Sequence, residues 1–150
     1  YKKSKTIASF LSIKSEIPTN GINKFLQESY KILCFPVIDK EKKGRLIFKS
    51  FSSKDKLIIG KFGTQEPLDT KECIPDIIIT PCLAYDEQGY RLGYGGGYYD
   101  KTFEYLRSIK HNFVSVGLAY DDQKIKSVPH DSFDVRLNYV LTEKRLYKIL

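Results

Sequence analysis

The feature that most constrains this chain is a glycine-rich run at residues 91–100, which reads R-L-G-Y-G-G-G-Y-Y-D. Glycine adopts positive φ without steric cost, so a cluster of glycines predicts a tight turn whose backbone can approach another molecule closely. Successive unpaired backbone N–H groups at such a turn form a concave site for anions. The run therefore predicts an anion-binding loop, although a glycine cluster taken alone is equally typical of a flexible turn.

A helix is predicted directly after this loop. Tyr99, Phe103, Leu106 and Ile109 recur at steps of four, three and three, the spacing of an amphipathic helix. The unpaired amides and the positive end of the helix dipole at such a start both favour phosphate, and Arg91 adds a fixed charge. The run is neither of the two common nucleotide signatures, because it has no Gly-Lys-Ser/Thr ending and no regular G-x-G-x-x-G spacing.

Length and composition limit the class of protein. The 150 residues fit one domain with a sizeable core. No apolar run approaches the roughly 20 residues that span a bilayer, so we expect a cytoplasmic protein with no membrane partner. Cys34, Cys73 and Cys82 are odd in number and contain no C-x-x-C pair, which predicts buried thiols and not a disulfide framework or a zinc site.

The net charge of +7 predicts anionic partners, among which charge alone does not choose. The lysines at residues 40–43 and 144–148 are most simply explained as solvated surface. The many tyrosines do not alternate with basic residues as they do in RNA-binding sheets. We therefore expect no nucleic-acid partner, and we expect a monomer.

Predicted strands alternate with predicted helices. Strands are predicted at residues 6–12, 32–38, 46–51, 76–80, 113–118 and 139–142, a first helix at residues 22–30, and a loop at residues 61–67. Residues 76–80 (D-I-I-I-T, between two prolines) are typical of a central parallel strand covered on both faces. This order predicts a three-layer α/β/α domain with a mostly parallel central sheet.

Ligands of such sheets bind at the carboxyl ends of the strands. The loops at residues 11–16, 81–100 and 120–134 all follow predicted strands. They are therefore expected to converge on one cleft.

Further short segments accompany the glycine-rich run. They are residues 7–19, which contain S-I-K-S-E-I-P-T, then G-T-Q-E-P at 63–67, I-T-P at 79–81, and the tail from residue 129 through residue 134 to residues 142–143. By their order and spacing the chain resembles the 5-formyltetrahydrofolate cyclo-ligase family, also called methenyltetrahydrofolate synthetases, over nearly its whole length. The glycine-rich run is the specific part of this resemblance.

The resemblance implies a Rossmann-like fold, like that of the CoA transferases. It also implies an ATP- and Mg²⁺-dependent cyclisation of 5-formyltetrahydrofolate to 5,10-methenyltetrahydrofolate, a ligase reaction that releases ADP and phosphate. The formyl oxygen would attack the γ-phosphate, and the 10-nitrogen would then close the ring as phosphate leaves. Such chemistry depends on positioning the reactants and neutralising phosphate charge.

The resemblance also assigns roles to residues. Its ATP loop corresponds to Arg91, Leu92, Gly93, Tyr94, Gly95, Gly96, Gly97, Tyr98 and Tyr99. Its folate site corresponds to Leu11, Glu16, Tyr94, Gly95, Gly96, Gly97 and Tyr98. Arg91 and Tyr98 would take the catalytic roles, with Tyr99 favoured for packing, and Asp100 and Asp134 would bind Mg²⁺, a cation that accepts hard carboxylates.

Simpler explanations remain open for the three acids on sequence alone. Glu16 is typical of a surface loop, Asp100 of an acid that complements a helix dipole, and Asp134 of a turn or cap. The chain also departs from the family: Gly96 stands where some members have lysine, and we expect the single domain of residues 1–150 to lack the upstream ATP-contacting helix. A catalytically silent folate-binding homologue and a basic nucleotide- or RNA-binding module are the alternative functions.

Overall fold

The computed structural model describes residues 6–13, 16–29, 32–39, 41–42, 44–60 and 63–150. Its helices and strands are β1 (Thr6–Ala8), α1 (Asn20–Glu28), β2 (Ile32–Ile38), β3 (Leu46–Ser50), β4 (Leu57–Ile59), β5 (Gln65–Pro67), β6 (Glu72–Cys73), β7 (Ile77–Pro81), β8 (Ala84–Tyr85), β9 (Arg91–Leu92), α2 (Tyr98–Ser108), β10 (Val114–Leu118), a 3-10 turn (Asp121–Gln123), β11 (Tyr139–Leu141) and β12 (Leu146–Lys148).

The central sheet has eight strands in the order β12-β11-β10-β7-β1-β2-β3-β6. The five inner strands from β11 to β2 pair in parallel. Antiparallel pairing occurs only toward the edges of this sheet, where β12 joins β11 and where β3 and β6 extend beyond β2. The predicted mostly parallel sheet is confirmed.

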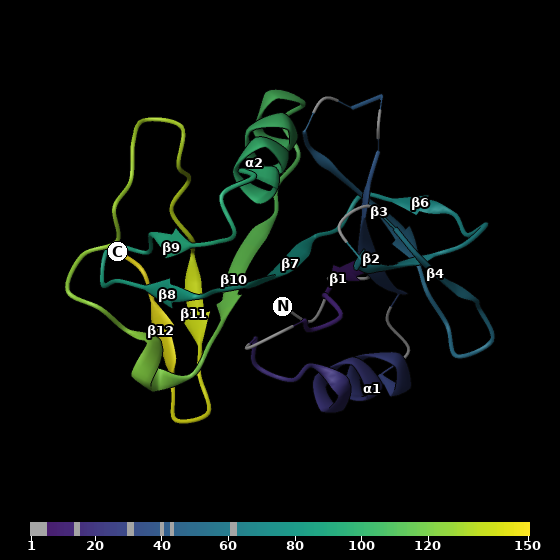
Figure 1. Cartoon of the computed structure of the whole chain (residues 1–150), viewed down its shortest axis with the longest axis horizontal. Helices are drawn as coiled ribbons and strands as arrows, with labels where there is room; N and C mark the ends of the chain where they lie inside the picture. Colours follow the sequence, from purple (N-terminus) through teal and green to yellow (C-terminus); the bar gives the residue numbers. More distant parts are fainter. Residues whose placement is uncertain (1–5, 14–15, 30–31, 40, 43, 61–62) are drawn as a thin grey trace.

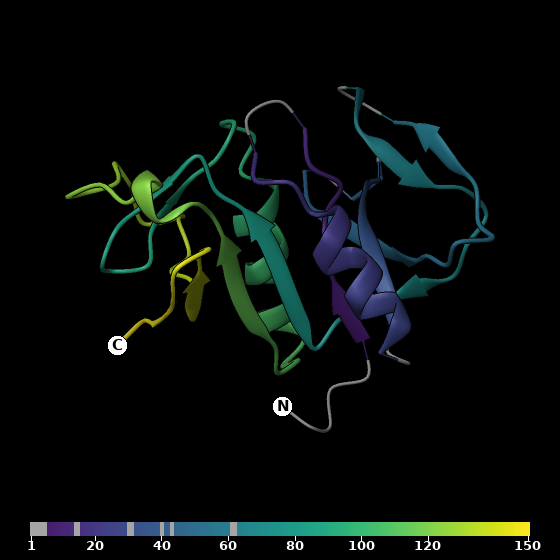
Figure 2. The ribbon, with the colours of Figure 1, turned by 90° about the horizontal axis from the view of Figure 1, so that it is seen from below.

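The two α-helices cover opposite faces of this sheet. The chain crosses from β1 through α1 to β2 in one direction, and from β7 through α2 to β10 in the other. Right-handed crossovers in opposite directions place their helices on opposite faces. Figures 1 and 2 show α1 and α2 on either side of the sheet, so the three-layer arrangement is also confirmed.

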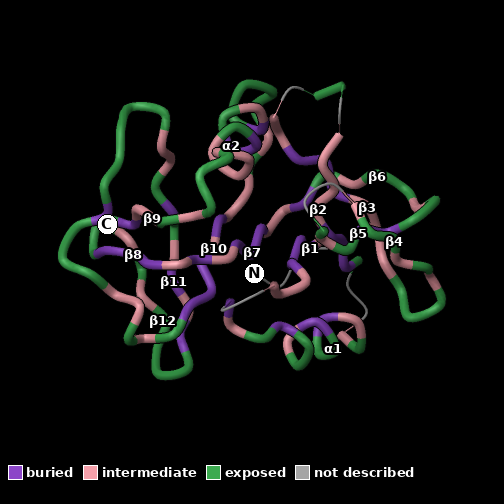
Figure 3. Tube along the Cα trace, viewed as in Figure 1, coloured by how far each residue is buried: buried purple, intermediate pink, exposed green. Residues whose placement is uncertain are grey.

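The core consists of two clusters, one on each face of the sheet. Adjacent strand residues alternate between them: Ile7 belongs to one cluster and Ala8 to the other, and Ile79 and Ile78 divide in the same way. Successive side chains of a strand point to opposite faces. Because both faces are packed, β1 and β7 carry continuous apolar sequence, and Figure 3 shows the middle of the sheet buried.

The strand order places a reversal between β1 and β7. From β1 the chain proceeds outward to β2, and later returns to β7 on the other side of β1 before continuing to β10 and β11. The loops that follow β1 and β7 therefore leave in opposite directions and open a crevice at the carboxyl ends of the strands, the usual ligand position in such sheets.

A polar network fixes the end of β1 to helix α1. The Phe10 carbonyl accepts hydrogen bonds from the Thr19 hydroxyl at 2.7 Å and the Asn23 amide at 3.1 Å. The Ser9 hydroxyl donates to Asn23, which is buried in α1. This network explains why β1 ends at Ala8 although residues 6–12 were predicted as strand: the following backbone pairs with side chains of the helix.

Most other predicted elements lie within one or two residues of their observed bounds, and β2 matches exactly. The loop predicted at residues 61–67 is wrong in part, because Gln65–Pro67 forms β5 and pairs with β4. Residues 61–62 of that loop, and residue 30 of the first predicted helix, lie outside the described residues. The short strands β4, β6, β8, β9 and β12 were not predicted.

A tight contact in the middle of β10 gives a test of this packing. A Cβ on Gly117 would lie 2.6 Å from Leu137 Cδ1 and 2.8 Å from Cys82 Sγ, both of which are buried. Gly117→Ala should therefore lower the free energy of unfolding by about 1–3 kcal/mol through overpacking. The measurement is urea denaturation followed by circular dichroism.

Gly21 in helix α1 is the matched control. A Cβ there meets no atom of the described residues within 4 Å, so Gly21→Ala should raise the free energy of unfolding by about 0.4–1 kcal/mol. Equal stability of the two variants would contradict this account of the core.

Candidate functional site

A cavity of about 250 Å³ lies at the carboxyl ends of the central strands. It is lined by Glu16, Pro81, Leu83, Arg91, Leu92, Gly93, Tyr94, Gly95, Gly96, Gly97, Tyr98, Tyr99, Asp100, Pro129 and Asp134. We call it the glycine-loop pocket. The loops after β1 and β7 and the loop before β11 supply its walls, so the predicted convergence of three loops is confirmed.

Two glycines of the loop are required by backbone conformation. Gly95 has φ of 94° and Gly97 has φ of 66°, values at which a side chain is strained. Gly97 directly precedes α2. The exposed loop thus turns sharply into the first turn of a helix, where backbone N–H groups lack helical partners.

The other two glycines lie against the ends of side chains. A Cβ on Gly93 would lie 2.9 Å from Arg91 Nη1, and a Cβ on Gly96 would lie 2.6 Å from the Tyr98 ring. The Tyr98 ring thus covers the position of residue 96. Two glycines of the run are thus favoured by their backbone conformation and two by the side chains packed against them, which favours a built site over a loose turn.

Arg91 is held at the wall of the glycine-loop pocket. It lies on β9, which pairs with β8, and its Nη1 donates to the Pro81 carbonyl at 3.2 Å. Its guanidinium carbon lies 5.0 Å from the centre of the Tyr99 ring. The buried Nε has no hydrogen-bond partner among the described residues. A fixed guanidinium on the wall of this pocket suits a phosphate or carboxylate ligand.

Asp100 and Asp134 bring two carboxylates to the same pocket. Asp100 lies in the first turn of α2, and its Oδ1 accepts from the Val135 N–H at 3.0 Å. Burial raises the pKa of Asp100, opposed by the Val135 N–H and Arg91 and reinforced by Asp134. A divalent cation between these acids would relieve both the burial and the repulsion.

These residues fit Mg²⁺ as a partial ligand set. Within the described part of the chain, no group of three or more His, Cys, Asp or Glu side chains is arranged to hold a metal ion. A cation bound by Asp100 and Asp134 would therefore complete its shell with waters and phosphate oxygens, as Mg²⁺ ordinarily does.

Glu16 is buried at the edge of the glycine-loop pocket, with 8% of its surface exposed. Its Oε1 accepts from the Ile13 N–H at 2.8 Å, which closes the turn after β1. Burial raises the pKa of Glu16, while the Ile13 N–H and Arg91 act in the opposite direction. The alternative explanation of Glu16 as a surface acid is wrong.

A second, mostly apolar cavity of about 140 Å³ adjoins the first. It is lined by Phe10, Leu11, Ile13, Glu16, Pro36, Ile38, Leu46, Thr64, Gln65, Glu66, Pro81, Tyr94 and Tyr99. We call it the apolar pocket. It shares Glu16, Pro81, Tyr94 and Tyr99 with the glycine-loop pocket, so these residues form the boundary between the two.

The two pockets together include every residue that the sequence assigned to a site. Leu11 lies in the apolar pocket and the others line the glycine-loop pocket. Tyr99, assigned to packing, borders both. Sequence reasoning did not assign residues 64–66 to a wall, although G-T-Q-E-P at residues 63–67 was one of the segments that carry the family resemblance.

The chain was compared with known protein families, curated proteins and solved structures. Residues 1–143 match the sequence model of the 5-formyltetrahydrofolate cyclo-ligase family. The chain belongs to this family. It is 32% identical over 148 residues to 5-formyltetrahydrofolate cyclo-ligase of Escherichia coli K12, covering 95% of this chain and 80% of that protein.

Two other proteins of this kind are similar to the chain in sequence or in structure. The Haemophilus influenzae cyclo-ligase is 33% identical over 145 residues, which cover 93% of this chain and 76% of that protein. The structure of Aquifex aeolicus 5,10-methenyltetrahydrofolate synthetase superposes with a TM-score of 0.80 at 29% identity, covering 99% of this chain and 73% of that one. Fold and family resemblance are thus both confirmed.

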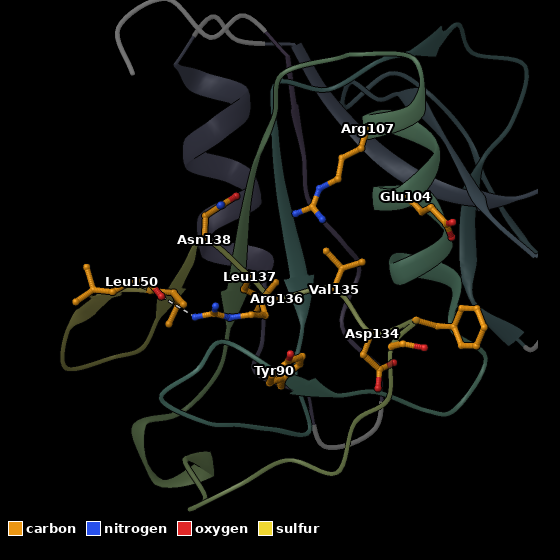
Figure 4. Close-up of a pocket in the computed structure, with 12 residues that line it drawn as sticks. Tyr90, Glu104, Arg107, Asp134, Val135, Arg136, Leu137, Asn138 and Leu150 are labelled. Atoms are coloured by element: carbon orange, nitrogen blue, oxygen red, sulfur yellow. Dashed lines mark hydrogen bonds between the residues drawn. The ribbon is translucent and has the colours of Figure 1, made fainter.

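A larger hollow than these two pockets also has Asp134 in its lining. It measures about 590 Å³ and is open between α2 and the chain before β11, where Figure 4 shows the Arg107 guanidinium extending from α2 toward Val135. Arg136 there donates to the carbonyls of Gln88 and Leu150. The glycine loop is absent from its lining, so we place the candidate site in the two smaller pockets.

None of the helices in the described residues is both long and apolar enough to cross a membrane.

The raised pKa of Asp100 gives a test with a definite sign. A folded-state pKa above the unfolded value means that the ionised carboxylate destabilises the folded protein at neutral pH. Without metal, Asp100→Asn should therefore raise the thermal midpoint at neutral pH, since an amide oxygen can still accept from Val135. The advantage should shrink as the pH falls through the folded-state pKa and vanish below about pH 3.9, the ordinary value for Asp.

Thermal denaturation at a series of pH values, with a chelator present, measures this effect. Asp122→Asn, which changes an exposed acid of the 3-10 turn, is the control and should leave the midpoint unchanged. A lower midpoint for Asp100→Asn at neutral pH would contradict the prediction.

Proposed function

We propose that this chain converts 5-formyltetrahydrofolate to 5,10-methenyltetrahydrofolate with ATP and Mg²⁺, releasing ADP and phosphate. The observation that carries the proposal is the shared boundary of the two pockets, where an anion site meets an apolar cavity at Glu16 and Tyr94. A nucleotide phosphate in the first pocket and a reduced pterin in the second would meet at this boundary. Family membership supports the same reaction.

The chemical problem is that an amide oxygen is a poor leaving group. In the proposed reaction the formyl oxygen bonds to the γ-phosphorus and ADP leaves. The 10-nitrogen then attacks the formyl carbon, loses its proton, and phosphate departs with the former formyl oxygen. Both steps are governed mainly by the position of the reactants and by neutralisation of phosphate charge.

The glycine-loop pocket would supply the charge neutralisation. The backbone N–H groups of residues 93–97 and the start of α2 would bind phosphate oxygens. Arg91, whose guanidinium is held on the pocket wall, would bind a further oxygen, and Tyr98 would offer a hydroxyl on the same wall. Asp100 and Asp134 would hold Mg²⁺, which supplies a divalent charge to the phosphates when bound.

The apolar pocket would hold the folate. Leu11 and Tyr94 would cover the faces of the pterin ring, while the buried carboxylate of Glu16 would accept hydrogen bonds from its N–H groups. Since Glu16 lines both pockets, it would hold the reactive half of the ring next to the phosphate. We further infer that the protein acts on these small molecules as a cytoplasmic monomer without nucleic-acid or membrane partners.

The test is the near-ultraviolet absorbance of the methenyl product. Full-length protein with 5-formyltetrahydrofolate and ATP should produce it only when Mg²⁺ is present. Asp100→Ala should lower the rate by at least about 10- to 100-fold, the range found when groups supporting a metal are removed. Asp122→Ala, an exposed acid outside both pockets, is the matched control and should keep the wild-type rate.

Two results would overturn the proposal. Folate binding without product in the presence of Mg²⁺ and ATP would indicate a silent homologue. No folate binding by correctly folded protein would leave the glycine loop as an anion site for another ligand.

A further inference from the structure

Glu66, on strand β5, is a buried carboxylate that has no role in the proposed reaction. We infer that Glu66 is a second folate-binding residue, which accepts hydrogen bonds from the amino-pyrimidine end of the pterin ring while Glu16 holds the other end. The inference rests on the proposed function, because it assumes a reduced folate in the apolar pocket.

The surroundings of Glu66 are unusual for a charge. Only 7% of its surface is exposed. It lines the apolar pocket, where Glu16 is the other charged residue and most of the wall is aliphatic or aromatic. Among the described residues no lysine or arginine lies within ion-pair distance of Glu66. A buried carboxylate is costly unless donors surround it.

The carboxylate of Glu66 is held rigidly by two elements. Its Oε2 accepts from the Ile38 N–H of β2 at 2.7 Å. Its Oε1 lies against Gly60, where a Cβ would overlap it. Gly60 in turn donates its N–H to the Thr64 carbonyl at 2.7 Å, beside the β4–β5 ladder. A group fixed by backbone on both sides is positioned before any ligand arrives.

This arrangement leaves acceptor capacity unused. An ionised carboxylate offers about four lone-pair sites, and the described residues fill one of those on Glu66 with the Ile38 N–H. A ligand that suits the remaining sites must be flat enough for a small apolar pocket and must carry N–H donors. An amino-pyrimidine ring has both properties, since its 2-amino group and N3–H lie side by side and match a carboxylate.

The positions of the two glutamates orient the ring. Glu16 lines both pockets, whereas Glu66 lines only the apolar one. The formyl group and the 10-nitrogen must face the phosphate in the glycine-loop pocket. The pyrimidine is the opposite end of the bicyclic ring system, so it would extend away from that boundary, toward Glu66.

The competing explanation is that Glu66 only ties the β4–β5 hairpin to β2. Glu66→Gln separates the two roles, because the amide oxygen still accepts from Ile38 while the charge is lost. A second carboxylate that binds folate predicts a rise of about 10- to 100-fold in the KM and Kd for 5-formyltetrahydrofolate, with the KM for ATP unchanged. The exposed Glu72→Gln on β6 is the matched control and should change neither.

A substrate analogue without the 2-amino group sharpens the test. If Glu66 binds that group, Glu66→Gln should change the Kd of the 2-desamino analogue by less than about threefold, because coupled partners are non-additive. Gly60→Ala should weaken folate binding as well, since its Cβ displaces the Glu66 carboxylate without removing it. Thermal midpoints of all variants, measured in parallel, show whether the fold is kept.

The outcomes separate this inference from the proposed function. If the wild-type protein makes methenyl product and Glu66→Gln leaves folate affinity unchanged, Glu66 is only a structural tie and the inference is overturned. Equal loss of folate and ATP affinity with a lowered thermal midpoint would have the same meaning. If the wild-type protein neither binds folate nor makes product, the proposed function itself has failed.

Discussion

The burial of β1 and β7 on both faces is the constraint on which the rest of the structure depends. Helices α1 and α2 cover the two faces, so neither strand has a side open for polar groups. Polar and ligand-binding groups therefore gather at the carboxyl ends of these strands, where the strand order reverses between β1 and β7. The loop that carries Glu16 begins immediately after β1. The hydrogen bonds from Thr19 and Asn23 to the Phe10 carbonyl fix this loop at the end of the strand.

Much of the fold could be predicted because the apolar runs of buried strands and the apolar spacing of helices are visible in short stretches of neighbouring residues. The composition of residues 76–80 predicts a buried parallel strand, and the apolar residues that recur at helical steps from Tyr99 predict α2. Strands such as β8 and β9 could not be predicted, since two residues are too few to show an apolar pattern. Part of what holds this hairpin is distant in the chain: the buried carboxylate of Asp86 accepts from the local N–H groups of Gln88 and Tyr90 and also from the N–H of Val128.

The candidate site was accessible from sequence for a different reason. The glycines, Asp100 and Asp134 were recognised through a resemblance whose motifs keep their order, and the structure places them around one cavity. What sequence could not provide was the part of the apolar pocket's wall that Glu66 forms. Glu66 reaches the apolar pocket only because β5 folds back along β2, a contact that follows from tertiary structure and not from the pattern of residues 61–67.

The packing of Tyr98 on Gly96 has a consequence for how this loop can change during evolution. A lysine at position 96 would meet the ring of residue 98 with its first carbon, so the exchange of glycine for lysine is not a single independent step. The two positions must change conformation or identity together. A side chain introduced at position 96 alone would therefore push the Tyr98 ring away from its place on the wall of the glycine-loop pocket.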